Sequence, residues 1–439
     1  MSVKENITPE LLTRYQELVA PKKKLRKKGS RPMIIFFIIC VIIGAFIGAG
    51  IPILEDLGVL EFDIVPPFRV EKGLVFIYPI VFVLYYYVTM VLHTIIHEGG
   101  HLIFGLLTGY RFLSFRVFSF TLVKKDGKLV WKKLKVPGTL GQCLMYPPEW
   151  KDNEEYPYVW YNLGGGLLNL VFCVLSIPLF FFHSPLAAWA AGFFVFTGVI
   201  FGITNLVPMS LGLPNDGKNC LLCAKAKENQ KAVYAQLKIN AMLSDGAMIT
   251  DIPEDLLCVG EEQPINALTA FLRLMKIYQH FALGEEEKAE TCLAELEAAM
   301  DKLPVAFANT FDLERLYLLL QQEAPIEEIA AYYAVLQPVF LQVKDISVLR
   351  IKYVYYLFLS DEERETVEWL IRSKKGKLPK KLPKQKKPVT AENIFENMEK
   401  AYAKHPVFGE AELHMSMVRE LAKATVSEVS EEKNVAETE

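Results

Sequence analysis

Four long apolar runs constrain the fold of this 439-residue chain more than any other feature. They lie at 33–54, 74–96, 160–182 and 186–208, and the second continues as mainly apolar sequence to Leu107. A helix that crosses a bilayer needs about 20 consecutive apolar residues. The runs, in a chain that is 52% hydrophobic, predict an α-helical polytopic membrane protein with about four transmembrane helices.

The first run, 33–54, follows a longer basic segment than the charged start of a secretory signal, so it is predicted to be an uncleaved span. In the second run, Pro79 predicts a kink, or a helix that starts after the proline.

Lysine and arginine set the expected orientation of the spans. The cluster "PKKKLRKK" places residues 1–32 inside as a basic cytoplasmic segment, and "VKKDGKLVWKKLK" places 109–157 inside as well. The 55–73 loop is acidic or neutral and is expected outside. The prediction is therefore an integral membrane protein, bacterial in type, of the plasma membrane, with both termini cytoplasmic.

The cytoplasmic segment between the second and third spans has the pattern of strands. Polar and apolar residues alternate around Asp126-Gly127, a pair typical of tight hairpin turns. We expect a β-hairpin insertion at about 110–137 within a transmembrane domain of residues 33–217. The following stretch, 138–150, is interpreted as an irregular loop at the membrane surface.

After the last span, residues 218–375 are charged and helix-periodic, with weak self-similarity at roughly 38 residues, near the period of tetratricopeptide repeats. A plain helical bundle explains the pattern nearly as well. Helix-pair arrays offer a concave surface, so the domain is expected to bind a cytoplasmic protein partner, or else to act as a stabilising cap. Residues 376–439 are predicted to be a basic linker, a short helical segment at about 392–423 and an acidic tail.

The chemistry is concentrated in the second run, in the sequence His97-Glu98-Gly99-Gly100-His101. On a helix, residues four apart share a face, so both imidazoles could bind one zinc ion with the glutamate beside it. Ionisable groups inside a span are costly and usually have a function. A coincidental helix face is the competing interpretation.

His93 lies one turn earlier on the same face. Catalytic zinc usually has three protein ligands and one open position, so a role beside the metal or in a channel, or simple packing, fits His93 better than ligation. Cys220 and Cys223 form a lone CxxC without a second pair and are interpreted as helix residues.

The third ligand must come from elsewhere, and Asp216 is the leading candidate. It follows the fourth span at its cytoplasmic end, where His97 and His101 are also expected. Prolines 208 and 214 would break the helix and let the carboxylate turn inward. A plain turn at a span end is the alternative for Asp216, and other carboxylates compete for the role: Glu149, Asp152, Glu154 and Glu155.

Taken together, these motifs resemble the site-2 protease family of intramembrane zinc metalloproteases (M50-type peptidases). The resemblance covers roughly 74–220 and rests on "HEGGH" within a span, the hairpin, "GGGLLNL" in the next span, and "NDG" after an Asn-x-x-Pro. It implies that His97, His101 and Asp216 hold zinc, and that Glu98 activates a zinc-bound water.

Two positions depart from the family pattern. The third-span motif of the family is Gly-Pro, two residues and Asn, but here glycine occupies the proline position in Gly165-Gly166-Leu167-Leu168-Asn169. The Leu-Asp-Gly of the family reads Asn215-Asp216-Gly217. The implied ligand set is intact.

The sequence thus predicts a zinc metalloendopeptidase that cleaves a membrane-anchored protein or peptide within or near the bilayer, in regulated intramembrane proteolysis. Asn169 is a candidate amide donor to the substrate or the oxyanion, or alternatively forms an interhelical hydrogen bond. The competing function is a non-proteolytic membrane scaffold that acts through its helical cytoplasmic domain. No nucleic-acid partner is expected, because the sequence shows no nucleic-acid-binding fold and the lysine run at 374–387 contains no aromatic residue.

Overall fold

The computed structural model describes residues 3–26, 38, 77–125, 127–133, 139–181, 185–210, 213–258, 265–304, 306–343, 345–374, 376–383, 389–405, 409 and 411–423. The predicted span at 33–54, the 55–73 loop and the acidic tail lie outside these residues, apart from residue 38. The chain forms two compact units, residues 29–237 and residues 1–28 with 238–439. We call them the membrane unit and the helical unit.

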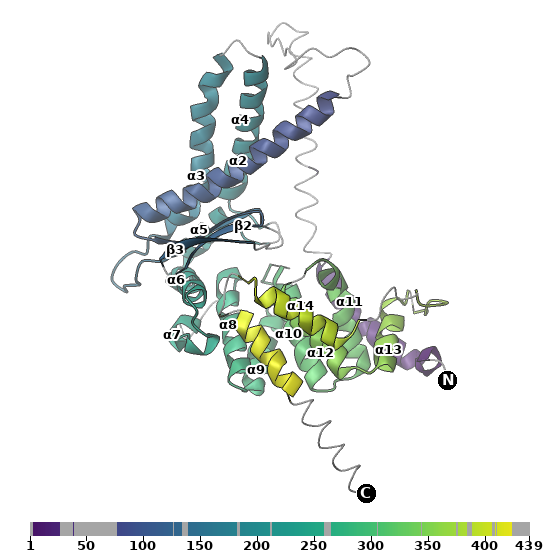
Figure 1. Cartoon of the computed structure of the whole chain (residues 1–439). Helices are drawn as coiled ribbons and strands as arrows, with labels where there is room; N and C mark the ends of the chain where they lie inside the picture. The colour runs from purple at the N-terminus through teal and green to yellow at the C-terminus, as the bar shows by residue number, and fades with distance from the viewer. Residues whose placement is uncertain are drawn as a thin grey trace. The chain divides into compact units, whose positions relative to one another are not determined.

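The membrane unit contains the three remaining predicted spans (Figure 1). They are α2 (Ile77–Leu107), α3 (Tyr158–Ser176), which η3 (Ile177–Phe181) extends, and α4 (Pro185–Leu206). Among the described residues, three helices are long and apolar enough to cross a membrane. Pro79 does not kink α2, because it lies in the first turn, where its missing N–H costs no helical hydrogen bond.

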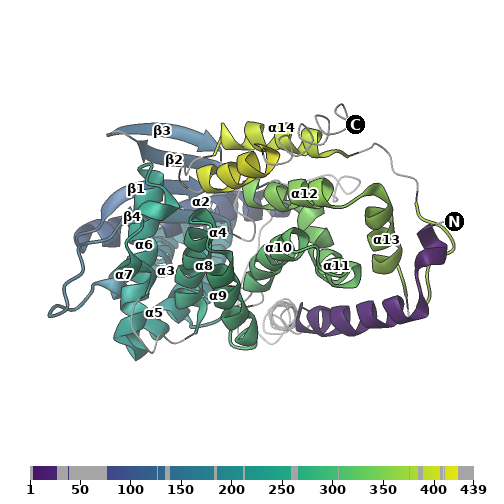
Figure 2. The ribbon, with the colours of Figure 1, turned by 90° about the horizontal axis from the view of Figure 1, so that it is seen from below.

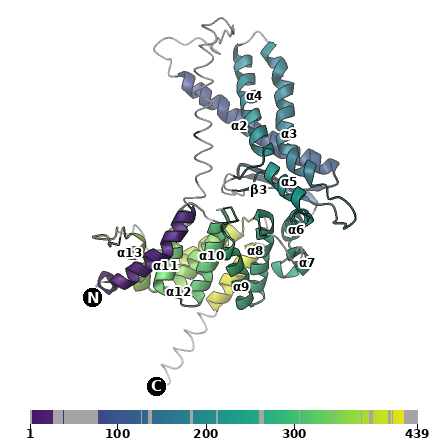
Figure 3. The ribbon, with the colours of Figure 1, turned by 180° about the vertical axis from the view of Figure 1, so that it is seen from behind.

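The three helices pack closely through glycines. In Figure 1, α2 crosses the other two obliquely, and the view from behind in Figure 3 shows α3 and α4 side by side. A Cβ on Gly100 would lie 2.6 Å from the carbonyl carbon of Gly164, and one on Gly166 would lie 2.7 Å from Leu206 Cγ. Small residues are the usual means by which helices approach one another in a membrane.

A four-stranded antiparallel sheet follows α2, with the order β3-β2-β1-β4. Its strands are β1 (Arg111–Val117), β2 (Phe120–Lys125), β3 (Lys128–Lys133) and β4 (Gly141–Tyr146). The predicted hairpin is β2–β3, with Gly127 at φ +74° in its turn.

The prediction of an irregular loop at 138–150 is wrong for Gly141–Tyr146. This stretch forms β4 and pairs with β1, and its Cys143 and Met145 point into the core. Its partner is more than twenty residues away along the chain, so local turn signals could not reveal the pairing.

The chain then enters α5 (Asp216–Lys225) and α6 (Lys227–Ser244), and the boundary between the units falls within α6. The helical unit continues with η4 (Ile249–Asp251), α7 (Glu254–Leu257), α8 (Ala267–Ala282), α9 (Glu286–Ala298), α10 (Ala306–Gln321), α11 (Ile326–Gln342), α12 (Ile346–Phe358), α13 (Asp361–Ile371) and α14 (Ala391–Tyr402). Successive helices pack as α8 with α9 and α10 with α11, and helices two apart pack as α10 with α12 and α11 with α13. Layered helix pairs therefore form this unit.

Both chain ends add a helix to the helical unit. The helix at 9–26 runs beside α11 and α13 in Figure 2. Its Arg14 pairs with Glu327 at 3.2 Å, and its Arg26 pairs with Asp312 at 2.7 Å. The predicted final helical segment is two helices, α14 and residues 411–423.

Candidate metal centre

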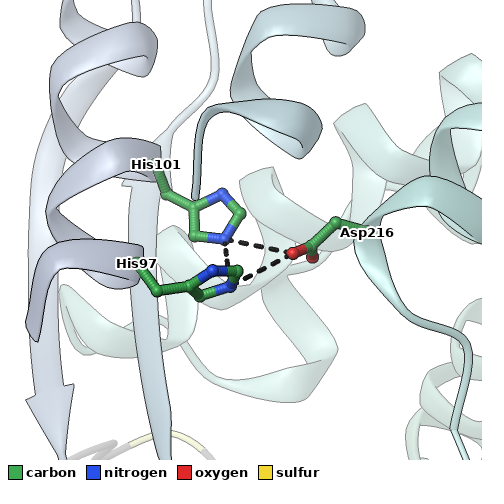
Figure 4. A group of neighbouring side chains, drawn as sticks. All are labelled: His97, His101 and Asp216. Atoms are coloured by element: carbon green, nitrogen blue, oxygen red, sulfur yellow. Dashed lines mark hydrogen bonds and ion pairs between the residues drawn. The ribbon is translucent and has the colours of Figure 1, made fainter. Parts of the chain in front are cut away.

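The helical geometry of α2 brings His97 and His101 together. They lie one turn apart on one face, and their Nε2 atoms are 3.2 Å apart (Figure 4). Both side chains are buried. Gly165 of α3 leaves room for them, because a Cβ there would lie 2.6 Å from His97 Cε1 and 2.7 Å from His101 Nε2.

Asp216 reaches the same point from the start of α5. Its Oδ2 lies 3.2 Å from His97 Nε2 and 3.4 Å from His101 Nε2, as Figure 4 shows. This buried oxygen forms no hydrogen bond of normal geometry with the described residues. Burial alone would raise the pKa of Asp216, but the two histidines hold it well below its ordinary value.

Asn215 fixes the position of Asp216. Its side chain caps α5 by accepting from the Lys218 N–H at 2.8 Å, and its amide donates to the carbonyls of Thr204 and Val207 at the end of α4. A Cβ on Gly217 would lie 2.7 Å from the Leu206 carbonyl carbon, so glycine is needed for this close turn.

The outer nitrogens of the two histidines have different partners. His101 Nδ1 donates to the Tyr161 carbonyl oxygen at 2.7 Å, so in the neutral ring the lone pair lies on Nε2. His97 Nδ1 lies 3.3 Å from the side-chain amide of Asn169, and the other end of that amide lies 2.9 Å from His93 Nδ1. His93 therefore contacts Asn169 rather than the group of three.

Glu98 is buried beside the histidines and lies against the first residue of β4. A Cβ on Gly141 would lie 2.6 Å from Glu98 Cγ, so this glycine admits the carboxyl group. Arg116 of β1 supports the strand, donating to Gly141 O at 3.1 Å and to Thr139 Oγ1 at 2.6 Å. Burial lowers the pKa of Arg116, and the charge of Glu98 opposes that shift.

Sequence reasoning missed Arg116, Gly141 and Tyr161. Tyr161 contacts His101 through its backbone carbonyl and its ring, and no local sequence signal marks either contact. The other two depend on β4, in a stretch interpreted as an irregular loop. An arginine inside an apolar alternating run was the available signal, since buried arginines need specific partners.

The other candidates are not part of this group. Among the described residues, His97, His101 and Asp216 form the set that could hold a metal ion. Glu149 accepts from the Tyr234 hydroxyl, Asp152 accepts from Trp150 Nε1, and Glu154 pairs with Lys151. Glu155 and the two cysteines of α5, Cys220 and Cys223, are likewise outside it.

The arrangement could therefore hold a metal ion, with the carboxyl group of Glu98 beside it. Two of its three ligand residues lie in α2, a helix long enough and apolar enough to cross a membrane. Comparison of the chain with protein-family models, curated proteins and solved structures gave no match.

Proposed function

We propose that this protein is a membrane-embedded zinc endopeptidase of the site-2 protease type, which cleaves a membrane-anchored protein or peptide within or near the bilayer. One observation carries the proposal: three ligand atoms from α2 and α5 converge within 3.4 Å, and Glu98, which follows His97 in sequence, is buried beside them.

The spacing of the three atoms fits zinc. Ligands at about 2.0–2.2 Å from one ion in tetrahedral geometry lie about 3.3–3.6 Å from one another. The observed separations are 3.2, 3.2 and 3.4 Å. Two imidazoles and a carboxylate are ligands typical of zinc, and three protein ligands leave one position for a water or a substrate, as in catalytic sites.

The chain supplies the base for hydrolysis. When bound, zinc would lower the pKa of a water molecule and polarise the scissile carbonyl. Glu98 accepts the proton of the attacking water and passes it to the leaving amine. Gly141 lies directly against that carboxyl group, and Arg116 holds this end of the strand through the Gly141 carbonyl.

The substrate must be extended where it is cut, because a helix shields its own peptide bonds. Strand β4 is an edge of the described sheet and begins beside Glu98, so a substrate segment could add to it as a further strand. A proline placed within Gln142–Leu144 should then impair cleavage, and unchanged cleavage would exclude this mode.

The helical unit is proposed to choose or position a protein partner or substrate. Layered helix pairs support this role, because such arrays present extended surfaces to other proteins. We place the protein in a bacterial-type plasma membrane with both termini cytoplasmic, since the basic clusters at 21–28 and 109–157 favour that side.

The test compares the purified wild type with Glu98→Gln. The zinc content of each is measured, and each is incubated with a library of single-span reporter proteins. Equal zinc with cleavage only by the wild type supports the proposal, because glutamine keeps the shape but cannot accept the proton. Glu154→Gln, which changes an exposed carboxylate, is the matched control and should cleave normally. No cleavage across the library would favour a scaffold acting through the helical unit.

A further inference from the structure

The two histidines of the candidate metal centre must present lone pairs on Nε2, so each needs its proton on Nδ1. For His101 the Tyr161 carbonyl settles this, because a carbonyl oxygen can only accept. For His97 the neighbour is the amide of Asn169, which has one end that donates and one that accepts. A further contact must therefore fix the orientation of the Asn169 amide, and with it the end that faces His97.

His93 is the residue that can fix the orientation of the Asn169 amide. Its ring is fully buried and bridges two partners, with Nε2 2.8 Å from the Phe194 carbonyl oxygen and Nδ1 2.9 Å from Asn169. The carbonyl requires a proton on Nε2. In a neutral ring, Nδ1 is then an acceptor and needs the NH₂ end of the Asn169 amide.

The two amide orientations have different consequences for the metal centre. With the oxygen of Asn169 toward His93, as the structure has it, both nitrogens of His93 must donate, so the ring is a buried cation. His97 Nδ1 then accepts, and the proton lies on Nε2 among the ligand atoms. A half-turn of the amide exchanges its ends: His93 becomes neutral, and His97 Nδ1 donates to the amide oxygen.

We infer that His93 is a positioning residue: acting through Asn169, it holds His97 in the tautomer that binds the metal, with the Asn169 amide turned so that its oxygen faces His97. The inference rests on the proposed zinc site and deepens it. It also gives Asn169 a role in metal binding instead of contact with the oxyanion. A charge buried in a helix of this kind is costly, which favours the neutral His93.

The surrounding structure is shaped for this contact. A Cβ on Gly198 of α4 would lie 2.7 Å from His93 Nε2, so the glycine makes room for the ring next to the Phe194 carbonyl. Asn169 is fully buried between the two histidines. The chain also offers a control, because Thr89 and Thr197 form a buried hydrogen bond of 3.0 Å between the same two helices, α2 and α4, away from the metal ligands.

The test measures the zinc affinity of the full-length protein in detergent by competition with a chelator, and the absorption spectrum of its cobalt(II) form. Removing an outer hydrogen-bond partner of a ligand typically weakens metal affinity roughly 10- to 100-fold. We expect losses of this size, with an altered cobalt spectrum, for His93→Leu and Asn169→Leu. Thr89→Val should match the wild type, which separates the effect from a general loss of packing.

Asn169→Asp gives a second test of the same inference. This test can be used even if His93→Leu does not fold. An ionised carboxylate can only accept, so it keeps the proton on His97 Nδ1 and should retain zinc affinity that Asn169→Leu loses. If Asn169 served only the oxyanion, both variants would keep zinc and lose cleavage. Wild-type affinity in His93→Leu or Asn169→Leu, or equal losses in the Asp and Leu variants, would overturn the inference.

The outcomes also separate this inference from the proposed function. If the wild type binds zinc but cleaves no reporter, the endopeptidase proposal is wrong. The zinc affinities of the His93 and Asn169 variants still test the role of His93. A wild type that binds no zinc overturns both.

Discussion

Gly100 of α2 and Gly164 of α3 meet backbone to backbone. A Cβ on Gly100 would lie 2.6 Å from the Gly164 carbonyl carbon, whereas one on Gly99 would meet nothing within 4 Å. The two glycines inside the HExxH motif therefore have different roles: one lets the helices touch, and the other only lowers helix propensity.

This difference predicts opposite effects of the same substitution. Gly100→Ala should destabilise the protein by about 1–3 kcal/mol, because overpacking forces the helices apart. Gly99→Ala should be neutral or stabilising by up to about 1 kcal/mol, since alanine favours the helix. Thermal unfolding of both variants in the same detergent measures this, and equal midpoints would show that the α2–α3 contact is wrong.

Gly141→Ala tests whether Gly141 is needed to position the Glu98 carboxylate. The added methyl group would displace the carboxylate, and a misplacement of about 1 Å can reduce turnover about 100-fold. Zinc content should not change, because the atoms nearest to the added methyl group belong to Glu98 and not to the three ligands. The control is Gly192→Ala, whose Cβ would meet nothing within 4 Å. Full reporter cleavage by Gly141→Ala would mean that Glu98 is not held there.

Arg350 and Glu314 form a fully buried ion pair in the helical unit, and Tyr278 also donates to Glu314. Breaking one partner leaves an uncompensated charge, so Glu314→Leu should cost about 3–5 kcal/mol. The double variant with Arg350→Met should recover much of that loss. The exposed pair Lys400–Glu396 is the control, where Lys400→Ala should cost at most about 1 kcal/mol. Denaturant unfolding followed by tryptophan fluorescence reports these differences, and additive losses would contradict the pairing.

His414 should make the docking of the last described helix sensitive to acid. Its ring is buried with Nδ1 unpaired, and burial, then Arg350 and His405, lower its pKa well below the ordinary value. Tyr278 packs edge-on against the ring and offers it no opposite charge. The folded state therefore keeps His414 neutral, while the unfolded state takes up a proton below its pKa of about 6.5.

Stability should then fall by up to about 1.4 kcal/mol for each pH unit below about 6.5. The protection factors of the amides in residues 411–423, which correct for the intrinsic pH dependence of hydrogen exchange, should fall between about pH 6.5 and 5.5 in the wild type, but much less in His414→Gln. An equal fall in both proteins would assign the effect to other groups.

The sequence alone is enough to predict which residues share one face of a helix, and also to predict the turn at Gly127. His97 and His101 needed only helical periodicity to share a face, and Asp216 needed only a broken helix at the end of a span. The basic segment at 21–28 was interpreted from its charge alone. In the structure, Lys22 and Arg26 pair with Asp312 of α10.

Long-range packing could not be read in this way. The β1–β4 pairing, the Gly100–Gly164 contact and the His93–Asn169 bridge each depend on the separation of two backbones, which one sequence does not encode locally. His93 remained open for that reason, because its partners come from α3 and α4.

We propose that His97, His101 and Asp216 together bind one zinc ion, and zinc binding by the wild type, Glu98→Gln and Asp216→Asn tests this. Asparagine keeps the size of the side chain at the start of α5 but removes the charge that faces both imidazoles. We expect one tightly bound zinc in the wild type and in Glu98→Gln, and a large loss of affinity in Asp216→Asn. Unchanged affinity in Asp216→Asn would show that Asp216 is not a zinc ligand.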